Sequence, residues 1–314
     1  MKVALVSTYE PERCGLREYS ENLTKAINAS DISVFRVGRP FDGDSLLERT
    51  ARFDIVHINH VWNLFGNLGA QHIRQMKNRG QKTLCTFNDS STDNRSEFTL
   101  AFDRVVVHQK TVDGFTYVPH GIPTKNLEPY EGKLRQYIGT SGFPMAFKNY
   151  PLAAQLAKSL DMHLYAILPD SRHANVQNVA YEIMRLCPGS VVDTSYPTHG
   201  RILDILSQCA FSLFPYRHET TGIGGSARVG VGAQRPVVIT NVIRFLDWVT
   251  DYKDEFYVIE DPYPTFASAY PVVKQVLEDV RNKRERIPVR TLQDQNWRKV
   301  AAQYVQVYRE LMAS

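Results

Sequence analysis

Residues 215–238 read PYRHETTGIGGSARVGVGAQRPVV, a run of small and hydroxyl-bearing residues between two apolar segments. The apolar segments 211–214 and 237–240 predict buried strands, and the small residues predict a loop that leads into a helix. Amide groups at a helix start have no partners within the helix, and glycine lets a phosphate or sugar approach the backbone closely. We expect this corner to hold the diphosphate and sugar of an activated donor. The alternative is a turn whose small residues serve only helix–sheet packing.

The donor-binding candidates in this corner offer backbone amides, hydroxyl groups, one carboxylate and one guanidinium. Hydroxyls and closely approached amides are the groups best suited to phosphate and sugar oxygens. The candidates are Glu219, Thr220, Thr221, Gly222, Gly224, Gly225, Ser226 and Arg228.

Composition limits the class of protein. The chain has 314 residues, 43% of them hydrophobic, which is enough for a large core and predicts more than one domain. Lys and Arg number 37 against 33 for Asp and Glu, a mild excess that permits anionic ligands without requiring nucleic acid. The basic run 281–290 is interpreted as a solvated helix end, with a nucleic-acid or anionic-lipid patch as the alternative.

Cysteine spacing and the N-terminus indicate the compartment. The four cysteines are far apart and form no Cys-x-x-Cys pair, which is typical of a reducing cytoplasm and argues against a disulfide scaffold or a zinc site. Residues 1–6 read as a strand and not as a signal peptide, and no apolar run approaches the length of a membrane span. A cytoplasmic protein without stable membrane insertion is expected.

Apolar segments of strand length alternate with amphipathic helices along the chain, as in parallel sheets covered on both faces. We predict an α/β protein with two Rossmann-like, doubly wound domains facing a central cleft, where ligands bind at the carboxyl ends of strands. Residues 123–135 are interpreted as the linker. The predicted parts are an N-terminal acceptor-side domain at 1–130, a nucleotide-sugar-binding domain at 131–295 and a terminal helix at 296–314.

The only Asp-x-Asp sequence is Asp42-Gly43-Asp44, a pattern that can hold a divalent cation. It stands in a Pro/Gly turn before a predicted helix, so a turn with a helix cap explains it better. No metal site is predicted. Strand periodicity places His57 in the core and His60 past the end of its strand, in the cleft.

Six stretches in order resemble the family-4 (group 1) retaining glycosyltransferases of the GT-B architecture. The first contains the Arg-Cys-Gly sequence of one subgroup, the fourth the loop of the phosphate-binding basic pair, and the sixth the helix that crosses back to the N-terminal domain. The stretches are 11–19 with 22–23, 53–60 with 64–66, 118–122, 142–148, 202–215 with 236–238, and 297–311.

The resemblance implies transfer of a hexose or similar sugar from a nucleoside diphosphate sugar to a hydroxyl acceptor. It implies retention of configuration, with the leaving phosphate oxygen helping to deprotonate the acceptor, and neither a metal nor a cofactor besides the sugar nucleotide. Lys148 matches the family's phosphate-binding lysine and is a catalytic candidate together with His60. Gly15 matches the glycine whose amide approaches the diphosphate, and Asn88 and Asp89 are candidates for the acceptor side.

The chain departs from the family pattern around the donor. The positions of the usual Glu-x7-Glu pair fall on Thr221 and Val229, so the ribose must be held differently. Phe143 stands where the arginine of the basic pair is expected, and Arg228 or Arg217 could supply its charge. The acceptor loop after the next strand lacks the family's common histidine.

These departures leave two other classes of function open. One is a non-catalytic protein that binds a sugar nucleotide or glycan on the same fold. The other is an epimerase of nucleotide sugars, for which Glu219 with Glu10 or Glu12 is the available carboxylate pair. For a transferase, the acceptor could be a glycan, a small molecule or a modified DNA base, the last kept open by the mild positive charge.

Overall fold

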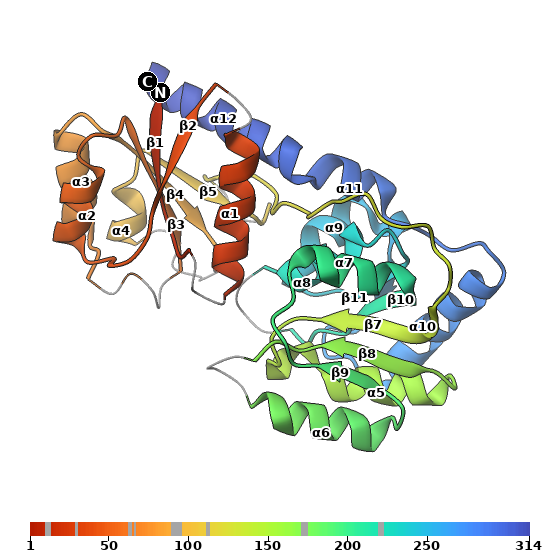
Figure 1. The fold of residues 1–314 in the computed structure, drawn as a ribbon. Coiled ribbons are helices and arrows are strands. Elements are labelled where there is room, and N and C mark those ends of the chain that lie inside the picture. The colour runs from red at the N-terminus through yellow and green to blue at the C-terminus, as the bar shows by residue number, and fades with distance from the viewer. Residues whose placement is uncertain are drawn as a thin grey trace. The chain divides into compact units, whose positions relative to one another are not determined.

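A computed structural model describes residues 1–9, 14–28, 31–61, 65, 67–88, 96–110, 114–170, 175–218 and 223–314. The chain divides into two compact units, shown in Figure 1. Of the described residues, the first contains Met1–Gly121, Ile223 and Gln295–Ser314, and the second contains residues 122–218 and Gly224–Asp294. The domain boundaries expected at residues 130 and 295 stay predictions.

The first unit is built on a parallel six-stranded sheet with the order β2-β1-β3-β4-β5-β6. Because β1 pairs with both β2 and β3, the chain winds outward in both directions from the space between β1 and β3. The elements are β1 (Lys2–Val6), α1 (Gly15–Ile27), β2 (Ser33–Val37), α2 (Gly43–Thr50), β3 (Ile55–His60), α3 (Ala70–Asn78), β4 (Lys82–Phe87), α4 (Glu97–Leu100), β5 (Arg104–Val107), β6 (Thr116–Tyr117) and, at the end of the chain, α12 (Trp297–Ala313).

The second unit has a parallel six-stranded sheet with the order β12-β11-β10-β7-β8-β9. Its switch point lies between β7 and β10, from which the chain again winds outward both ways. The elements are β7 (Leu134–Ser141), the 3-10 turn η2 (Ala146–Lys148), α5 (Tyr150–Ser159), β8 (His163–Ile167), α6 (Val176–Leu186), β9 (Val191–Asp193), α7 (His199–Gln208), β10 (Cys209–Phe214), α8 (Gly225–Gly232), β11 (Val237–Thr240), η3 (Ile243–Phe245), α9 (Leu246–Asp251), η4 (Lys253–Glu255), β12 (Tyr257–Ile259), α10 (Phe266–Arg281) and α11 (Val289–Gln295).

The predicted fold class of two doubly wound parallel sheets is confirmed, and so is the return of the terminal helix to the first unit. Helix α12 packs along α1 and buries an apolar stripe that includes Trp297, Val300 and Leu311. This stripe has the helical spacing of one face, so it provides the docking surface that an amphipathic terminal helix requires.

A buried chain of hydrogen bonds joins α12 to the sheet. His57 Nδ1 lies 2.7 Å from Tyr308 Oη, and His57 Nε2 lies 2.7 Å from Thr86 Oγ1. The Thr86 hydroxyl is 2.9 Å from Tyr304 Oη, which is 2.7 Å from Tyr19 Oη on α1. All five side chains are buried, so each polar group needs its partner in this chain. His57 is therefore a structural residue, as the strand periodicity predicted.

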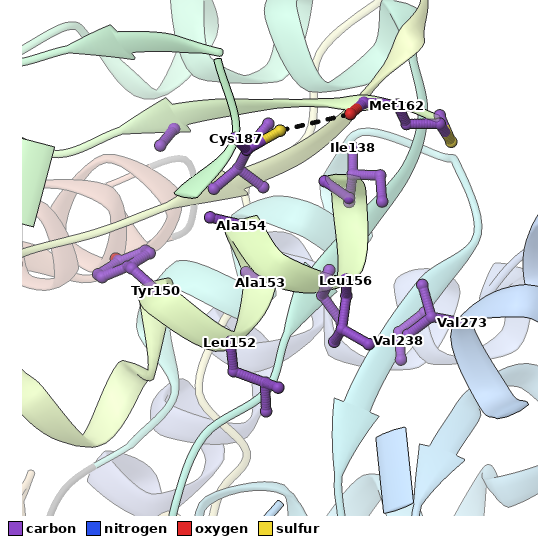
Figure 2. Close-up of a cluster of buried hydrophobic side chains, with 14 of the residues drawn as sticks. Ile138, Tyr150, Leu152, Ala153, Ala154, Leu156, Met162, Cys187, Val238 and Val273 are labelled. Carbon is purple, nitrogen blue, oxygen red and sulfur yellow. Dashed lines mark hydrogen bonds between the residues drawn. The ribbon is translucent and has the colours of Figure 1, made fainter. Parts of the chain in front are cut away.

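The core of the second unit holds α5 against its sheet. Figure 2 shows side chains from α5, β7, β11 and α10 meeting there, among them Leu156, Ile138 and Val238. Tyr150, at the start of α5, belongs to the same cluster, and its hydroxyl donates to Gly142 O at 2.7 Å. The core thereby fixes the connection between the end of β7 and the start of α5, which carries Lys148.

Three local features bear on how the chain enters and leaves its helices and strands. Helix α5 begins at Tyr150, because Asn149 adopts a left-handed conformation with φ of 56° and separates the helix from η2. The expected linker ends within β7. Asp42 caps α2 by accepting the Ser45 amide at 2.9 Å, which agrees with the helix-cap interpretation of the Asp-x-Asp sequence.

The basic run after α10 is partly used within the second unit. Arg286 lies over the Tyr257 ring at 4.4 Å, and Arg290 forms ion pairs with Asp254 and Glu255. These contacts agree with the interpretation of the run as a helix end and turn. In the part of the chain that the structure describes, no helix has the length and apolarity to cross a membrane.

We expect stability to fall below neutral pH because of His57. Burial, with a smaller effect from His108, lowers the pKa of His57 to about 3, against about 6.5 in an unfolded chain. The unfolded state binds a proton that the folded state excludes. The stabilising contribution of the neutral His57 is therefore fully present above about pH 6.5 and is lost as the pH falls toward 3. The contribution should amount to about 2 kcal/mol between pH 7 and pH 5, measured by urea unfolding.

His57→Gln should remove this part of the pH dependence. Tyr308→Phe is the control, because it deletes one hydrogen bond and keeps the imidazole, so it should lower stability at both pH values and keep the slope. An unchanged slope in His57→Gln would contradict this account of the buried histidine.

Candidate functional site

Lys148 and the start of α8 meet at the switch point of the second unit. Lys148 ends the turn η2, which follows β7, and α8 follows the neighbouring strand β10. The loops after the two strands that flank a switch point are where doubly wound sheets bind ligands. The donor corner predicted from residues 215–238 therefore lies at the expected edge of the sheet.

The Lys148 ammonium group is held between these two loops. Its Nζ donates to Ser226 Oγ at 2.9 Å and lies 5.7 Å from the centre of the Tyr216 ring. Gly142, just after β7, has a φ of 117°, and a Cβ there would overlap both Lys148 Nζ and Ser226 Oγ. Any other residue at 142 would have to displace this pair, so the corner requires glycine.

The charge of Lys148 is not matched within the described part of the chain. The side chain is 6% exposed, and no ion pair joins it to a described carboxylate. Burial, and to a smaller degree the nearby Arg244, lower the pKa of Lys148 to about 7. A buried ammonium without a counter-charge is costly, and an anionic ligand would supply the missing charge.

The start of α8 adds donors that point to the same corner. Gly224 is the N-cap and has no side chain to satisfy the first-turn amides, which begin at Gly225 and Ser226. The partial positive charge of a helix start favours anions. Ser226 is thus both the partner of Lys148 and a first-turn residue of α8.

Some of the small residues on α8 serve packing, as the alternative interpretation held. A Cβ on Gly224 would overlap the Phe245 ring, and one on Gly230 would overlap the Phe214 ring. The two interpretations of the stretch therefore apply to different residues. Within the stretch, Gly224 and Gly230 allow close packing, whereas Ser226 contacts the buried ammonium.

Arg228 lies in the interior. It is 1% exposed, its Nη2 lies 3.2 Å from Asp247 Oδ2, and its guanidinium lies 4.6 Å from the centre of the Trp248 ring. These contacts join α8 to α9. Direct contact of Arg228 with a donor stays a prediction, and the structure gives it a role in holding the two helices together.

Arg244 is the cation that the sequence analysis missed. It belongs to η3, after β11, is 8% exposed, and lies with its guanidinium 4.0 Å from the centre of the Phe147 ring. Phe147 precedes Lys148, and the charge of Arg244 acts on Lys148. One signal in the sequence could have found Arg244. The strand 237–240 follows the donor stretch, and a residue shortly after a parallel strand lies at the sheet edge where ligands bind.

Phe143 occupies the position where the family pattern has an arginine, and it places an aromatic ring at the carboxyl edge of the second sheet. The Phe143 and Tyr196 ring centres are 6.2 Å apart. Tyr196 follows β9, whose last residue, Asp193, accepts the Ser195 amide at 2.9 Å. The loop at 193–196 thus lies beside the loop after β7.

In the first unit, Gly15 and Asn88 lie at the carboxyl edge of the sheet. Gly15 begins α1, and a Cβ on it would meet no described atom within 4 Å, so its backbone faces open space. Asn88 follows β4 and donates through Nδ2 to Asn59 Oδ1. Asn59 Nδ2 in turn donates to Ser20 Oγ at 2.6 Å, a buried network that the sequence analysis did not identify.

His60 is the last residue of β3 and does not follow the strand, which corrects the expected position. It is 2% exposed and lies among the rings of Phe65, Phe87 and Phe98, with centre distances of 5.2, 5.0 and 5.1 Å. Burial lowers the pKa of His60 to about 4, so the imidazole is neutral near pH 7. A neutral ring can exchange hydrogen bonds but cannot stabilise an anion as a cation would.

The remaining candidates lie outside the described residues. These are Glu219, Thr220, Thr221, Gly222 and Asp89, together with Glu10 and Glu12 of the alternative carboxylate pair.

Comparison with known proteins identifies the fold. No protein-family model and no curated protein sequence matches the chain. Anabaena HepE in complex with UDP-glucose gives a TM-score of 0.71 at 10% identity, covering 99% of this chain and 100% of that one. A glycosyltransferase from Rickettsia africae gives 0.70 at 12% identity, covering 99% and 98%. An α-glucosyltransferase in complex with UDP and a 13-mer DNA containing an HMU base gives 0.67 at 10%, covering 99% of each. These likenesses show that the chain has the two-domain α/β fold of GT-B glycosyltransferases.

Lys148→Met should stabilise the ligand-free protein. The substitution keeps an unbranched side chain and removes a buried charge that no described carboxylate neutralises. We expect a gain of about 1–2 kcal/mol at pH 7, read as a higher unfolding temperature. Lys158→Met on the exposed side of α5 is the control and should leave the unfolding temperature nearly unchanged. A loss of stability in Lys148→Met equal to that of a core substitution would show that the ammonium is structural.

Proposed function

We propose that the chain is a glycosyltransferase that moves a sugar from a nucleoside diphosphate sugar to a hydroxyl acceptor. The observation that carries this proposal is the buried Lys148 ammonium, bonded to Ser226 at the start of α8 and without a described carboxylate partner. The fold supports it, because solved structures of the same fold hold UDP or UDP-glucose. A pyrophosphate would supply the negative charge that no described residue brings to Lys148.

The same groups would assist the reaction. When the bond between the sugar and the diphosphate breaks, negative charge develops on the departing phosphate. Lys148 and the first-turn amides of α8 are fixed donors, so they would stabilise that charge without rearranging. We propose that protein cations do this in place of a metal ion, that configuration is retained, and that the departing phosphate oxygen accepts the acceptor's proton.

The first unit would bind the acceptor in this proposal. Gly15 is proposed to offer its amide to the diphosphate, and Asn88 to contact the acceptor. The neutral imidazole of His60 is suited to a hydrogen bond with a sugar hydroxyl and not to charge stabilisation. The acceptor class proposed is a hydroxyl of a glycan or small molecule. The modified DNA base is not favoured, because Arg286 and Arg290 of the basic run are engaged with neighbouring side chains.

Nucleoside diphosphates should stabilise the protein in a manner that depends on Lys148. We expect one of UDP, GDP and ADP, at about 100 times its Kd, to raise the free energy of unfolding by about 2.7 kcal/mol, measured as a thermal shift. Lys148→Met should abolish the shift, whereas Lys158→Met should keep it. The shift should be largest below about pH 7 and decline above it, because binding requires the protonated ammonium.

Failure of all three nucleotides to bind would contradict the proposed function, and so would binding that survives in Lys148→Met. Release of free sugar from the bound sugar nucleotide separates a transferase from a non-catalytic binding protein. The transferase should hydrolyse its donor slowly without an acceptor, and the binding protein should leave it intact.

A further inference from the structure

A buried chain of side-chain hydrogen bonds lies at the switch point of the first unit. Ser7 follows β1, Asn59 belongs to the neighbouring strand β3, and Ser20 lies on α1. Asn59 Nδ2 donates to Ser20 Oγ at 2.6 Å and to Ser7 Oγ at 3.4 Å, and the Ser20 hydroxyl donates to Ser7 Oγ at 2.6 Å. All three side chains are completely buried, so their polar groups rely on one another for hydrogen bonds.

The chain of bonds ends at Asn88, a partly exposed residue that follows β4. Asn88 Nδ2 donates to Asn59 Oδ1, and the backbone N–H of Asn88 donates to His60 O at 3.2 Å. Its backbone and its side chain are therefore both held by β3. Because the nitrogen of the Asn88 amide faces the buried chain, the carbonyl oxygen of that amide faces away from it. Among the described residues, none donates a hydrogen bond to Asn88 Oδ1.

Asn59 determines which end of the Asn88 amide is offered to a ligand. The Ser20 proton is used on Ser7, so Ser20 Oγ accepts from Asn59 Nδ2 and leaves only Asn59 Oδ1 for Asn88. An amide oxygen accepts hydrogen bonds and cannot donate one, so it selects the N–H end of Asn88. A polar side chain of a loop residue is thereby held in one orientation, which is what a preorganised binding group requires.

We propose that Asn59 is a positioning residue for the acceptor and that Asn88 offers its carbonyl oxygen to it. This inference rests on the proposed function and names the acceptor class for it. In the transfer, the attacking hydroxyl oxygen bonds to the sugar carbon, and the electron pair of the broken carbon–oxygen bond leaves with the diphosphate. The proton of the attacking hydroxyl passes to the departing phosphate oxygen, so it is not available to Asn88. Asn88 therefore accepts from a second hydroxyl, and the acceptor is a polyol such as a sugar with neighbouring hydroxyls.

Water can stand in for such an acceptor, because it carries one proton for the phosphate and one for Asn88 Oδ1. Slow hydrolysis of the donor therefore reports on the orientation of Asn88 before the acceptor is identified. The probe is the glucose conjugate of whichever of UDP, GDP and ADP the protein binds, and the readouts are kcat and KM for release of glucose.

A double-mutant cycle at positions 59 and 88 tests the inference. Asn59→Leu should lower kcat about tenfold, roughly the effect of one hydrogen bond, and should keep KM for the donor. Asn88→Ala should lower kcat by a similar factor. The double variant should lose no more than either single variant, because Asn59 acts through Asn88. Asn59→Asp should recover most of the loss, because a carboxylate accepts hydrogen bonds and keeps Asn88 in the same orientation.

Two further variants separate positioning from stability. Ser20→Ala is milder than Asn59→Leu, and it should lower kcat by a smaller factor because it removes one acceptor of Asn59 Nδ2. Tyr308→Phe is the matched control, since it removes a buried hydrogen bond to His57, two residues before Asn59 on the same face of β3. It should lower stability and leave kcat unchanged.

The possible failures are distinct. Losses that multiply in the double variant would overturn the inference, and so would an unchanged kcat in Asn59→Leu and Ser20→Ala. Wild-type protein that binds a nucleotide and releases no glucose would overturn the inference and leave the nucleotide site in place. Wild-type protein that binds none of the three nucleotides would overturn the proposed function, and this inference with it.

Discussion

The hydrogen bond from Lys148 Nζ to Ser226 Oγ is the contact around which the second unit is arranged at its switch point. It joins the loop after β7 to the first turn of α8, and it explains why position 142 must be glycine. The surrounding core fixes both loops, through Tyr150 on one side and through Phe245 packed on Gly224 on the other. A buried ammonium without a described carboxylate is unfavourable in the ligand-free protein, so this unit is destabilised locally where it would bind an anion.

In the first unit, two buried networks of polar side chains are built from hydrogen bonds between neighbours. His57, Thr86 and the tyrosines of α12 satisfy one another, and Asn59 joins Ser20 and Asn88 in the same way. Matched networks fix the packing of a helix on a sheet. The reason for proposing the diphosphate site in the second unit is the buried Lys148 ammonium, for which no described carboxylate supplies a counter-charge.

The fold could be predicted from the sequence because its signals are local. Apolar segments such as 53–58 and 211–214 alternate with amphipathic helices, and the apolar spacing of Trp297, Val300 and Leu311 identifies the face that α12 buries. The signal that places Lys148 at the sheet edge is also local, because the residue stands shortly after a strand and just before a helix. The likeness to solved GT-B structures confirms this fold at identities too low for the match to prove function.

The rest of the site depends on tertiary contacts that local patterns do not contain. The direction of Arg228 is set by Asp247 and Trp248, which follow it by about twenty residues. The neighbourhood of Arg244 and Lys148 requires the order of the strands, because β7 and β11 both flank β10. His60 was expected beyond its strand, and pairing with β4 extends the strand to include it. In each case, contacts between residues far apart in the sequence determine where the side chain lies.

The position of the phosphates in a crystal structure with bound UDP, GDP or ADP tests the central claim most directly. The account predicts a phosphate oxygen about 2.7–2.9 Å from Lys148 Nζ, beside the first-turn amides of α8. Nucleotide bound away from the corner formed by β7 and β10, with Lys148 still bonded only to Ser226, would contradict it.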